Sequence, residues 1–311
     1  MVQGRKQKTN RLFRFWKLLR KAFIEMRRKD PLRMAGATAF FTTFALPPIL
    51  IILFQLLSLF LNRKMLGGEL RELLTNTFGP DSADQIRQTA RGFRQLASNG
   101  WIAAGGFLFL LFVATTLFSV IKNTLNDLWN IAVKEKPGIR FRILLRARSL
   151  AVILLTGVLF LAGIVVDSIE ILGGNYLDKI WPGGGLYFRS ILNETVSAVI
   201  CTIWFTVLFR YIADARPTWR TAIVGGTLTG ILFTAGKLLL STLMRNSQVD
   251  NIYGASGSIV LLLLFVFYSS FILYYGASFL NVYADAIRQP LQVVDKAYRY
   301  REVRVKEDDD A

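Results

Sequence analysis

The sequence predicts an all-α, polytopic membrane protein with about six transmembrane helices and with both the N and C termini in the cytoplasm. The first observation is composition: 53% of the 311 residues are hydrophobic and 19% are charged, as expected of a chain whose surface is largely solvated by lipid. The second is distribution, because the apolar residues form long uncharged runs. A helix needs about 20 such residues to cross a bilayer.

The uncharged runs predict six spans. The strongest is the last, which lies within the 34 uncharged residues between Asp250 and Asp285 and exceeds the length that a bilayer requires. The fourth is the shortest, and it spans only if Arg210 snorkels or if the helix continues through Tyr211 and Ile212. The predicted spans are residues 34–61, 101–121, 149–166, 195–209, 221–244 and 259–283.

The distribution of Lys and Arg predicts the orientation of these spans. Of the 38 basic residues, 28 lie in segments on one side of the predicted membrane and 9 on the other. Because short cytoplasmic segments carry the excess, we expect a basic cytoplasmic segment at 1–33, a membrane domain at 34–285 and an exposed, charged cytoplasmic tail at 286–311. Topology thereby accounts for most of the net charge of +17, so no nucleic-acid partner is expected.

The N-terminal segment, residues 1–33, is predicted to form an interfacial helix. Apolar residues recur there at intervals of three and four among Lys and Arg, which places one apolar stripe along a helix. Such a helix lies on the membrane surface and binds the anionic headgroups of inner-leaflet lipids. The alternative is a disordered basic tail that only orients the chain. The stripe consists of Leu12, Trp16, Leu19, Phe23 and Met26.

The chain lacks the most versatile catalytic side chain. It contains no His, which excludes Ser-His-Asp triads, Cys-His pairs and His-ligated zinc or haem. The single cysteine, Cys201, lies in an apolar run and is expected to be a packing residue. We therefore expect neither enzymatic activity nor a cofactor.

Two carboxylate pairs between the first two spans are the one arrangement suited to a divalent metal. Two arginines lie within helical reach of them as ion partners, so a solvated charged surface is the favoured interpretation. We therefore expect no bound metal. The residues concerned are Glu69, Glu72, Asp81, Asp84, Arg71 and Arg87.

The first span contains two adjacent prolines near its middle. Pro47 and Pro48 lack backbone donors and disfavour helical geometry at Leu46, so we expect a kink and free carbonyl groups one turn earlier. Broken helices near the membrane midplane recur at the binding sites of transporters. The alternative is a tolerated kink packed against neighbouring helices.

The fifth span has small residues at every fourth position. Ala222, Gly226, Gly230 and Thr234 form a groove that lets a neighbouring helix approach closely, and the sixth span is its expected partner. Lys237 leaves from the same face, three residues after Thr234. We therefore expect this lysine to point into the bundle.

Lys237 is the one charge predicted to lie inside a span. An ammonium there costs about 2.5–3.5 kcal/mol on insertion scales, which favours a compensating partner or a water-filled cavity. The expected partners are carbonyl groups freed at the prolines, an external anion, or the hydroxyls of Tyr268, Ser269 and Tyr275. Alternatively, Lys237 snorkels to the outer headgroups.

An amide stripe continues the second span at its cytoplasmic boundary. Asn123, Asn126 and Asn130 recur at intervals of three and four, which places them on one helix face. Together with Lys122 they are suited to bind a polar headgroup. Hydrogen bonding between helices is the alternative use.

Several short motifs along the chain resemble the YihY/virulence factor BrkB family. The resemblance covers about residues 20–285 and rests on the order and spacing of the motifs. It implies a six-helix protein of the bacterial inner membrane, with proposed roles in transport or in envelope lipids. The motifs are Asn126-Asp-Leu-Trp129, Pro217-Thr-Trp-Arg220, Gly225 and Gly226, Lys237, Tyr253-Gly254 and Tyr275-Gly-Ala277.

One position departs from the pattern of that family. Many members have Glu after the Gly-Ala pair, whereas this chain has Ser278, so a role of that acid in ion pairing or proton coupling is not carried over. The family has also carried a ribonuclease label. Without a His or a compact cytoplasmic carboxylate cluster, the sequence argues against a nuclease.

These observations favour a translocator of the plasma (inner) membrane, acting on an anionic amphiphile, a lipid or a small solute. The alternative is a non-transporting envelope scaffold or assembly protein that recruits partners through its basic ends. An intramembrane hydrolase is disfavoured, since no span pairs a nucleophile with a base. The sequence leaves open whether the chain forms a homo-oligomer. The proposed route is lined by Pro47, Pro48, Asn126, Arg220, Gly226, Gly230, Lys237, Tyr253, Gly254, Tyr275 and Ser278.

Overall fold

The computed structural model describes residues 2–57, 100–133, 184–246, 257–294 and 297–301, with short stretches between 67 and 88 and between 151 and 162. Most of the predicted third span lies outside the described residues, as do Glu69, Asp81, Tyr253 and Gly254. Within the described part of the acidic connection, Asp84 forms an ion pair with Arg87 at 3.3 Å, as the interpretation of a solvated surface predicts.

The described part of the fold is built from long helices. Those that coincide with predicted spans contain 27–30 residues, which corresponds to about 40–45 Å of helix, against about 30 Å for the hydrocarbon core of a bilayer. The helices are α1 (Val2–Arg27), α2 (Pro31–Leu57), α5 (Gly100–Leu128), α7 (Gly184–Tyr211), α8 (Trp219–Asn246) and α10 (Gly257–Ala286).

Helix α7 corrects the predicted length of the fourth span. It begins at Gly184, within the predicted outer connection at 167–194, and continues for 28 residues to Tyr211. Arg189 and Glu194 lie in its first turns, and such charges interrupt an apolar run without interrupting a helix. The apolar part of α7 among the described side chains is short, from Thr195 to Tyr211.

Residues with positive φ mark three of the helix ends. Asp30 (φ 51°) separates α1 from α2, Asn130 (φ 55°) follows α5, and Arg288 (φ 57°) follows α10. Pro31 then occupies the first position of α2, where its missing N–H is not needed and its fixed φ suits a helix. At each of these positions the left-handed backbone conformation ends the helix and turns the chain toward the next element.

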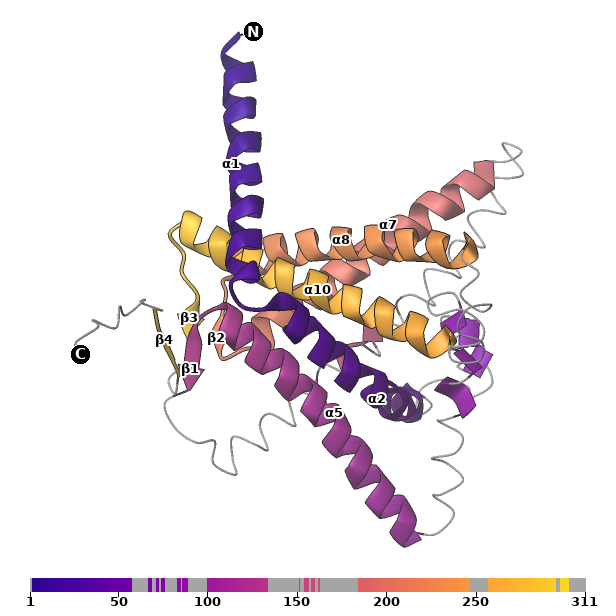
Figure 1. Ribbon diagram of the computed structural model, residues 1–311. Helices are drawn as coiled ribbons and strands as arrows, with labels where there is room; N and C mark the ends of the chain where they lie inside the picture. The colour runs from indigo at the N-terminus through magenta and orange to yellow at the C-terminus, as the bar shows by residue number, and fades with distance from the viewer. Residues whose placement is uncertain are drawn as a thin grey trace, which may run out of the picture.

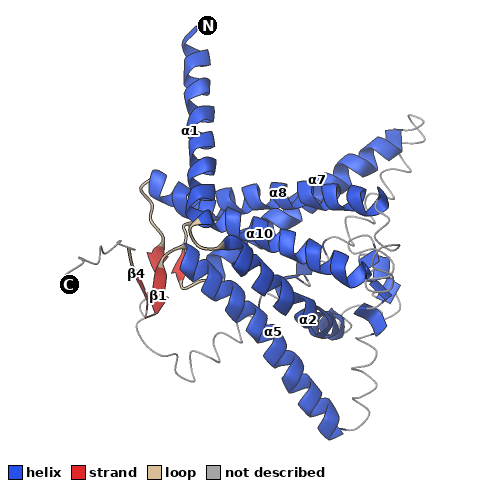
Figure 2. Ribbon diagram, viewed as in Figure 1, coloured by secondary structure: helices blue, strands red, loops and turns tan. Residues whose placement is uncertain are grey.

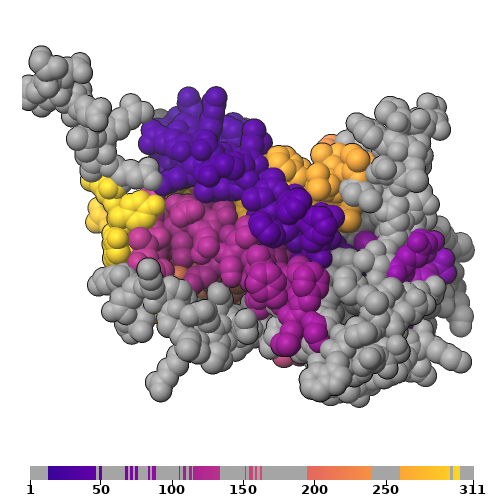
Figure 3. All heavy atoms as spheres, turned by 60° about the horizontal axis from the view of Figure 1, so that its bottom comes forward, coloured from indigo at the N-terminus to yellow at the C-terminus, as the bar shows by residue number. Residues whose placement is uncertain are grey.

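The helices meet at one end and diverge at the other (Figure 1). The starts of α2 and α8 lie at the shared end together with the ends of α5 and α10. Helix α10 packs against α1, α2 and α8, while α7 packs against α8 and α2 packs against α5. Helix α1 projects sideways from the shared end, across the direction of α8 and α10. In the space-filling view, α1 and α2 form one surface beside α5 (Figure 3).

Two short antiparallel ribbons close the shared end of the bundle (Figure 2). Strand β1 (Ile131–Val133) pairs with β4 (Ala297–Arg299), and β2 (Ala215–Arg216) pairs with β3 (Gln292–Val293). Both β3 and β4 belong to the segment predicted as an exposed tail. Their backbones pair with the segments that follow α5 and α7, and their side chains are exposed or half-buried.

The surface of the helices is apolar where they diverge. Leu108 and Phe112 of α5 and Leu239 of α8 are each more than 60% exposed, as expected of side chains that face lipid. Among the described side chains, Trp219–Leu239 and Val260–Ala286 are long and apolar enough to cross a membrane, and Thr195–Tyr211 is a shorter apolar helix. The core lies near the shared end and contains fully buried Trp129, Phe209, Tyr274 and Leu280.

Candidate functional site

Lys237 lies between α7 and α8, with its side chain half-buried. Its Nζ donates a hydrogen bond to Ser197 Oγ of α7 at 3.3 Å. This partner was not among the predicted ones, whose hydroxyls are engaged elsewhere. Tyr268 donates to Leu232 O, Ser269 donates to Phe265 O and Tyr275 donates to Leu19 O. The ammonium therefore meets a neutral dipole.

Lys237 and Ser197 lie at neighbouring levels of the α7–α8 pair. Gly230 lies at the level of Thr202 of α7, and Ser197 lies five residues farther along the pair, or about 7.5 Å of helix. The Cα of Lys237 lies seven residues beyond Gly230, or about 10.5 Å. Lys237 and Ser197 thus lie within about one helical turn of each other along the pair, as their hydrogen bond requires.

The small-residue groove of α8 packs against α7, which corrects the prediction that α10 would fill it. A Cβ added at Gly226 would lie 2.9 Å from Thr206 N and 3.0 Å from Thr202 O, and one at Gly230 would lie 3.0 Å from Thr202 N. These are backbone atoms, so the two helices approach closely only because both positions are glycine. Helix α10 covers another face of α8, where Tyr268 lies against Gly236.

Tyr275 and Ser278 of α10 hold α1 in place. Tyr275 Oη donates to Leu19 O at 3.2 Å, and Ser278 Oγ, which is buried, donates to Ala22 O at 2.8 Å. Both acceptors are carbonyl groups within α1. The position at which the resemblance implies Glu therefore carries a helix-docking contact in this chain.

The docking face of α1 differs from the predicted apolar stripe. Leu19 packs against α10 and Met26 is fully buried, as the stripe requires, but Trp16 (67%) and Phe23 (46%) are exposed. Ala22, which is outside the stripe, is fully buried against Phe279 and Val282 of α10. The bundle thus packs against the face of α1 centred on Ala22. The Trp16 ring is on the outer surface, and the half-exposed Phe23 ring has an edge contact with Tyr275 of α10.

The Pro217-Thr-Trp-Arg220 motif builds the turn between α7 and α8. Pro217 O accepts a hydrogen bond from Arg210 Nη1, and the Arg210 guanidinium lies 5.2 Å from the Trp219 ring. Thr218 precedes the helix, and its Oγ1 accepts a hydrogen bond from Thr221 N at 3.4 Å, as an N-cap residue does. Arg220 is exposed on the first turn of α8 and lies apart from Lys237.

A buried charge cluster joins α5 to the same turn. Lys122 Nζ lies 2.8 Å from Asp214 Oδ2, and both side chains are about 95% buried. Asn126 donates to Asp214 Oδ2 at 2.9 Å and accepts from Asp214 N at 3.0 Å. Val294 N donates to Asp214 O at 3.1 Å. Asn126 thus serves hydrogen bonding between elements, one of its two predicted uses.

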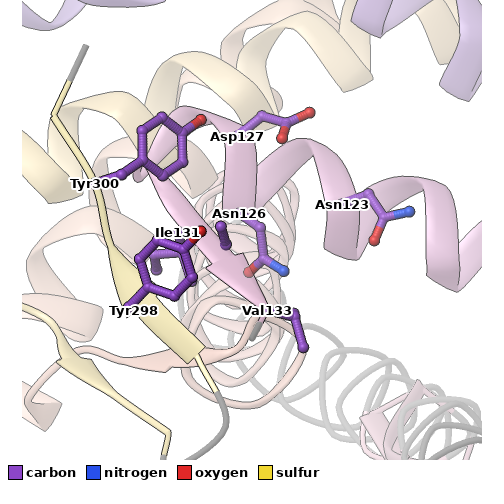
Figure 4. A pocket seen from close by; sticks show the side chains of 8 residues that line it. Asn123, Asn126, Asp127, Ile131, Val133, Tyr298 and Tyr300 are labelled. Atoms are coloured by element: carbon purple, nitrogen blue, oxygen red, sulfur yellow. The ribbon is translucent and has the colours of Figure 1, made fainter. Parts of the chain in front are cut away.

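A recess of about 630 Å³ lies between the end of α5 and the β1–β4 ribbon. Its wall from α5 carries Asn123, Asn126 and Asp127, and Tyr298 and Tyr300 face them from the strand side (Figure 4). Partial desolvation raises the pKa of Asp127, and the positive charges of Lys29 and Arg33 oppose this rise. The floor is apolar, formed by residues 131–133.

The structure distributes the residues of the predicted route over several separate sites. Gly226, Gly230 and Lys237 share the α7–α8 interface, Asn126 belongs to the charge cluster, and Tyr275 and Ser278 lie under α1. Pro47 and Pro48 lie within α2, whose helical backbone is continuous through both. Trp129 of the resemblance motif donates Nε1–H to Ala277 O at 2.9 Å, which joins two of the motifs.

The sequence did not reveal Ser197 or Asp214 as participants in these sites, and it predicted Lys122 to bind a headgroup rather than to form a buried ion pair. Ser197 looks like an ordinary residue of an apolar run, and Asp214 lies 88 residues from Asn126. One signal was present for Asp214: it is the sole acid among the basic residues of the segment 210–220. A lone acid in a basic cytoplasmic turn is a candidate partner for a buried cation.

The similar proteins found by comparison all carry the same name. The chain is 26% identical over 274 residues to a UPF0761 membrane protein of Saccharophagus degradans, covering 88% of this chain and 60% of the relative. It is 25% identical over 256 residues to one of Psychromonas ingrahamii (82% and 83%) and 27% identical over 247 residues to one of Pseudomonas aeruginosa (78% and 57%). The chain thus spans only about three fifths of the length of two of these relatives. No solved structure matches.

The family comparison covers most of the chain. The sequence model described as virulence factor BrkB matches residues 22–297, a range that includes every described element from the end of α1 to β3. The relatives are named as membrane proteins, in agreement with the apolar helices described above. The chain is an integral membrane protein and belongs to the virulence factor BrkB family.

Proposed function

We propose that the protein translocates an anionic amphiphile or lipid across the bacterial inner membrane, with Lys237 contacting the negatively charged headgroup. The observation that carries the proposal is the surroundings of Lys237: a half-buried ammonium inside a helix pair, with the neutral hydroxyl of Ser197 as its contact. A charge in that position is costly unless it is compensated. A phosphate or carboxylate group of a ligand supplies the compensation.

The proposed topology has six spans with both termini in the cytoplasm. The ends predicted to be cytoplasmic, namely the starts of α2 and α8 and the ends of α5 and α10, lie together at the shared end of the bundle (Figure 1). The basic segments before α2 and between α7 and α8 lie there too. This grouping supports the orientation expected from the distribution of Lys and Arg.

The apolar surface beside Lys237 suits the tails of an amphiphile. Ile231, Leu238 and Leu239 of α8 are all about half exposed or more, and they lie on the outward side of the same helix. A headgroup held at the ammonium keeps its acyl chains in lipid. The proposed route therefore follows the α7–α8 pair along the bilayer and requires no wide channel, and it includes no catalytic step.

Flux measurements in proteoliposomes test this proposal. The substrate is a fluorescent anionic phospholipid, and the readout is the fraction that a membrane-impermeant quencher can reach with time. Lys237→Met should lower the protein-dependent rate at least about tenfold, because an interaction with a charged group is lost. Lys237→Arg retains the positive charge and should retain most of the rate. Arg216→Met, which removes an exposed cation between α7 and α8, is the matched control.

Equal rates for wild type and Lys237→Met, in protein that inserts and folds normally, would argue against the proposed role. A rate lost in both Lys237→Met and Arg216→Met would point to a general effect of surface charge. Activity that needs α1 but tolerates every core substitution would support the alternative of a non-transporting scaffold.

Helix α1 is proposed to bind the anionic headgroups of the inner leaflet. A recess of about 410 Å³ on its surface is lined by Lys17, Arg20, Lys21 and Arg28 together with Ile24 and Glu25. The exposed Trp16 ring lies on the same helix, and tryptophan favours the membrane interface. Because α1 projects across the direction of the spans, it is oriented to lie along the membrane surface. Cosedimentation with phosphatidylglycerol vesicles should weaken when these four cations are replaced by Gln.

A further inference from the structure

The α7–α8 seam, where these two helices face each other, has a cation near each end. On α8 the seam runs from Trp219 through Gly226 and Gly230 to Lys237. Trp219 and Lys237 are 18 residues apart, which is five turns, so both leave from the same face of α8 at levels about 27 Å apart. The guanidinium of Arg210 lies 5.2 Å from the Trp219 ring. The two cations are thus separated by about the thickness of a hydrocarbon core, about 30 Å.

Arg210 belongs to the face of α7 that meets α8. Thr206 and Thr202 precede it at intervals of four residues, and residues with this spacing share a helix face. Thr206 lies against Gly226, and Thr202 lies against Gly230. Arg210 therefore continues the same face as far as the turn between α7 and α8, at the shared end of the bundle where α8 starts (Figure 1).

The guanidinium of Arg210 has donors without a protein acceptor. Nη1 donates to Pro217 O, whereas Nε has no hydrogen-bond partner among the described residues. Asp214, the acid four residues away, is engaged by Lys122 and Asn126, and no described carboxylate forms an ion pair with Arg210. The edge that carries Nε and Nη2 is the fork that binds a phosphate group with two hydrogen bonds.

The side chains around Arg210 suit the headgroup level of a membrane. Trp219 and Tyr211 are both about half exposed, with ring centroids 6.2 Å apart, and these two residue types favour the membrane interface. Ile223, one turn farther along α8, is 50% exposed and offers apolar surface to an acyl chain. An amphiphile with a phosphate group meets both the cation and the apolar surface, whereas a soluble phosphate meets only the cation.

We propose that the phosphate group of an anionic phospholipid docks on the Nε–Nη2 edge of Arg210, beside Trp219, and that this is the loading end of the seam that leads to Lys237. The inference deepens the proposed function and rests on it, because it supplies the cytoplasmic starting point of the proposed route. It differs from the proposed role of α1, whose four cations line a recess on α1 itself.

Docking is measured on the full chain in nanodiscs of phosphatidylcholine, which has no net charge, with phosphatidylglycerol added in steps. The readout is the ¹H–¹⁵N NMR signal of the Arg210 Nε–H group, identified as the signal that is missing in Arg210→Lys. We expect this signal to shift saturably with the fraction of phosphatidylglycerol, because the phosphate accepts its hydrogen bond. Trp219→Leu should raise the half-saturating fraction severalfold, whereas Trp219→Phe keeps an aromatic ring and should stay close to wild type.

Two matched variants separate this site from surface charge and from Lys237. Arg216→Met removes an exposed cation from the same connection and should leave the titration unchanged. Lys237→Met should also leave it unchanged, so that failure of the transport proposal and failure of this one are distinguishable. An Arg216→Met protein that loses the response would show an effect of general charge and would overturn the site.

The flux assay tests the loading role. Trp219→Leu should slow transport at a low fraction of labelled phosphatidylglycerol and approach the wild-type rate at a high fraction, because a weaker loading site is filled by mass action. A rate lowered equally at every fraction would contradict loading. The proposal is also overturned if phosphatidylglycerol leaves the Arg210 signal unmoved, or if inorganic phosphate alone shifts it in nanodiscs of phosphatidylcholine, since the ligand would then be a soluble anion.

Discussion

Two lysines of this protein occupy contacts between helical elements, and their surroundings differ. Lys122 is 4% exposed and lies 2.8 Å from the Asp214 carboxylate, which also accepts a hydrogen bond from Asn126. Lys237 is half-buried and contacts a hydroxyl at 3.3 Å. A paired carboxylate can offset the desolvation of an ammonium, whereas a hydroxyl offsets it only in part. We therefore infer that the charge of Lys122 stabilises the fold, and we propose that the charge of Lys237 binds a ligand.

Breaking the pair at Lys122 should have the largest effect on stability. Lys122→Met leaves the Asp214 carboxylate buried without its cation, and removing one partner of a buried pair costs about 3–5 kcal/mol. The measurement is the free energy of unfolding of the purified protein in mixed micelles, followed by the helical signal. The double variant Lys122→Met/Asp214→Asn should lose less than the sum of the two single variants. If Lys122→Met were as stable as wild type, the Lys122–Asp214 pair would not stabilise the fold, and the contrast with Lys237 would fail.

Widening the α7–α8 contact should have the next largest effect. Gly226→Ala places a methyl group against backbone atoms of Thr202 and Thr206, and overpacking of this kind costs about 1–3 kcal/mol. Gly105→Ala is the matched control, because a Cβ at that position has nothing within 4 Å. It should be neutral or stabilising by up to about 1 kcal/mol. If the two variants unfold alike, the close approach that positions Lys237 is not tightly constrained.

Removing the α1 anchor should have a smaller and local effect. Ser278→Ala deletes the hydrogen bond to Ala22 O, worth about 0.5–1.5 kcal/mol, and should speed hydrogen exchange of amides near residues 19–26. Ser270→Ala is the matched control, because its buried hydroxyl donates to Val266 O within the same helix. Equal exchange in α1 for both variants would show that Ser278 does not hold α1.

Replacing Lys237 should affect stability least. Lys237→Met gives up one long hydrogen bond but also removes the cost of placing an ammonium within a span. We expect the free energy of unfolding to stay within about 1 kcal/mol of wild type, in contrast to Lys122→Met. A loss as large as that of Lys122→Met would indicate that Lys237 is a second structural lysine.

The sequence predicted most of the helices, because uncharged runs and their lengths are set by the bilayer. It did not predict the start of α7, since Arg189 and Glu194 interrupt the apolar run while the helix continues. The pairings of β3 and β4 involve two or three residues each, too few for a periodic pattern. The family resemblance, by contrast, is confirmed over residues 22–297.

The candidate site was predicted in part, for a physical reason. Spacing identifies which residues share a helix face, and it correctly grouped Gly226, Gly230 and Lys237. Spacing does not identify the neighbour that the face meets, so α10 was predicted where α7 packs. The pairing of Lys122 with Asp214 joins residues 92 positions apart; the lone acid in a basic turn marks Asp214 as a candidate, but spacing does not identify its partner.

The most direct test of the contrast between the two lysines is native mass spectrometry of gently extracted wild type, Lys237→Met and Lys237→Arg. We predict that wild type and Lys237→Arg retain a specific anionic lipid or other anion. Lys237→Met should lose this ligand although its free energy of unfolding is close to that of wild type. The same bulk lipids on all three proteins would contradict the account, because the charge of Lys237 would then have no ligand to hold.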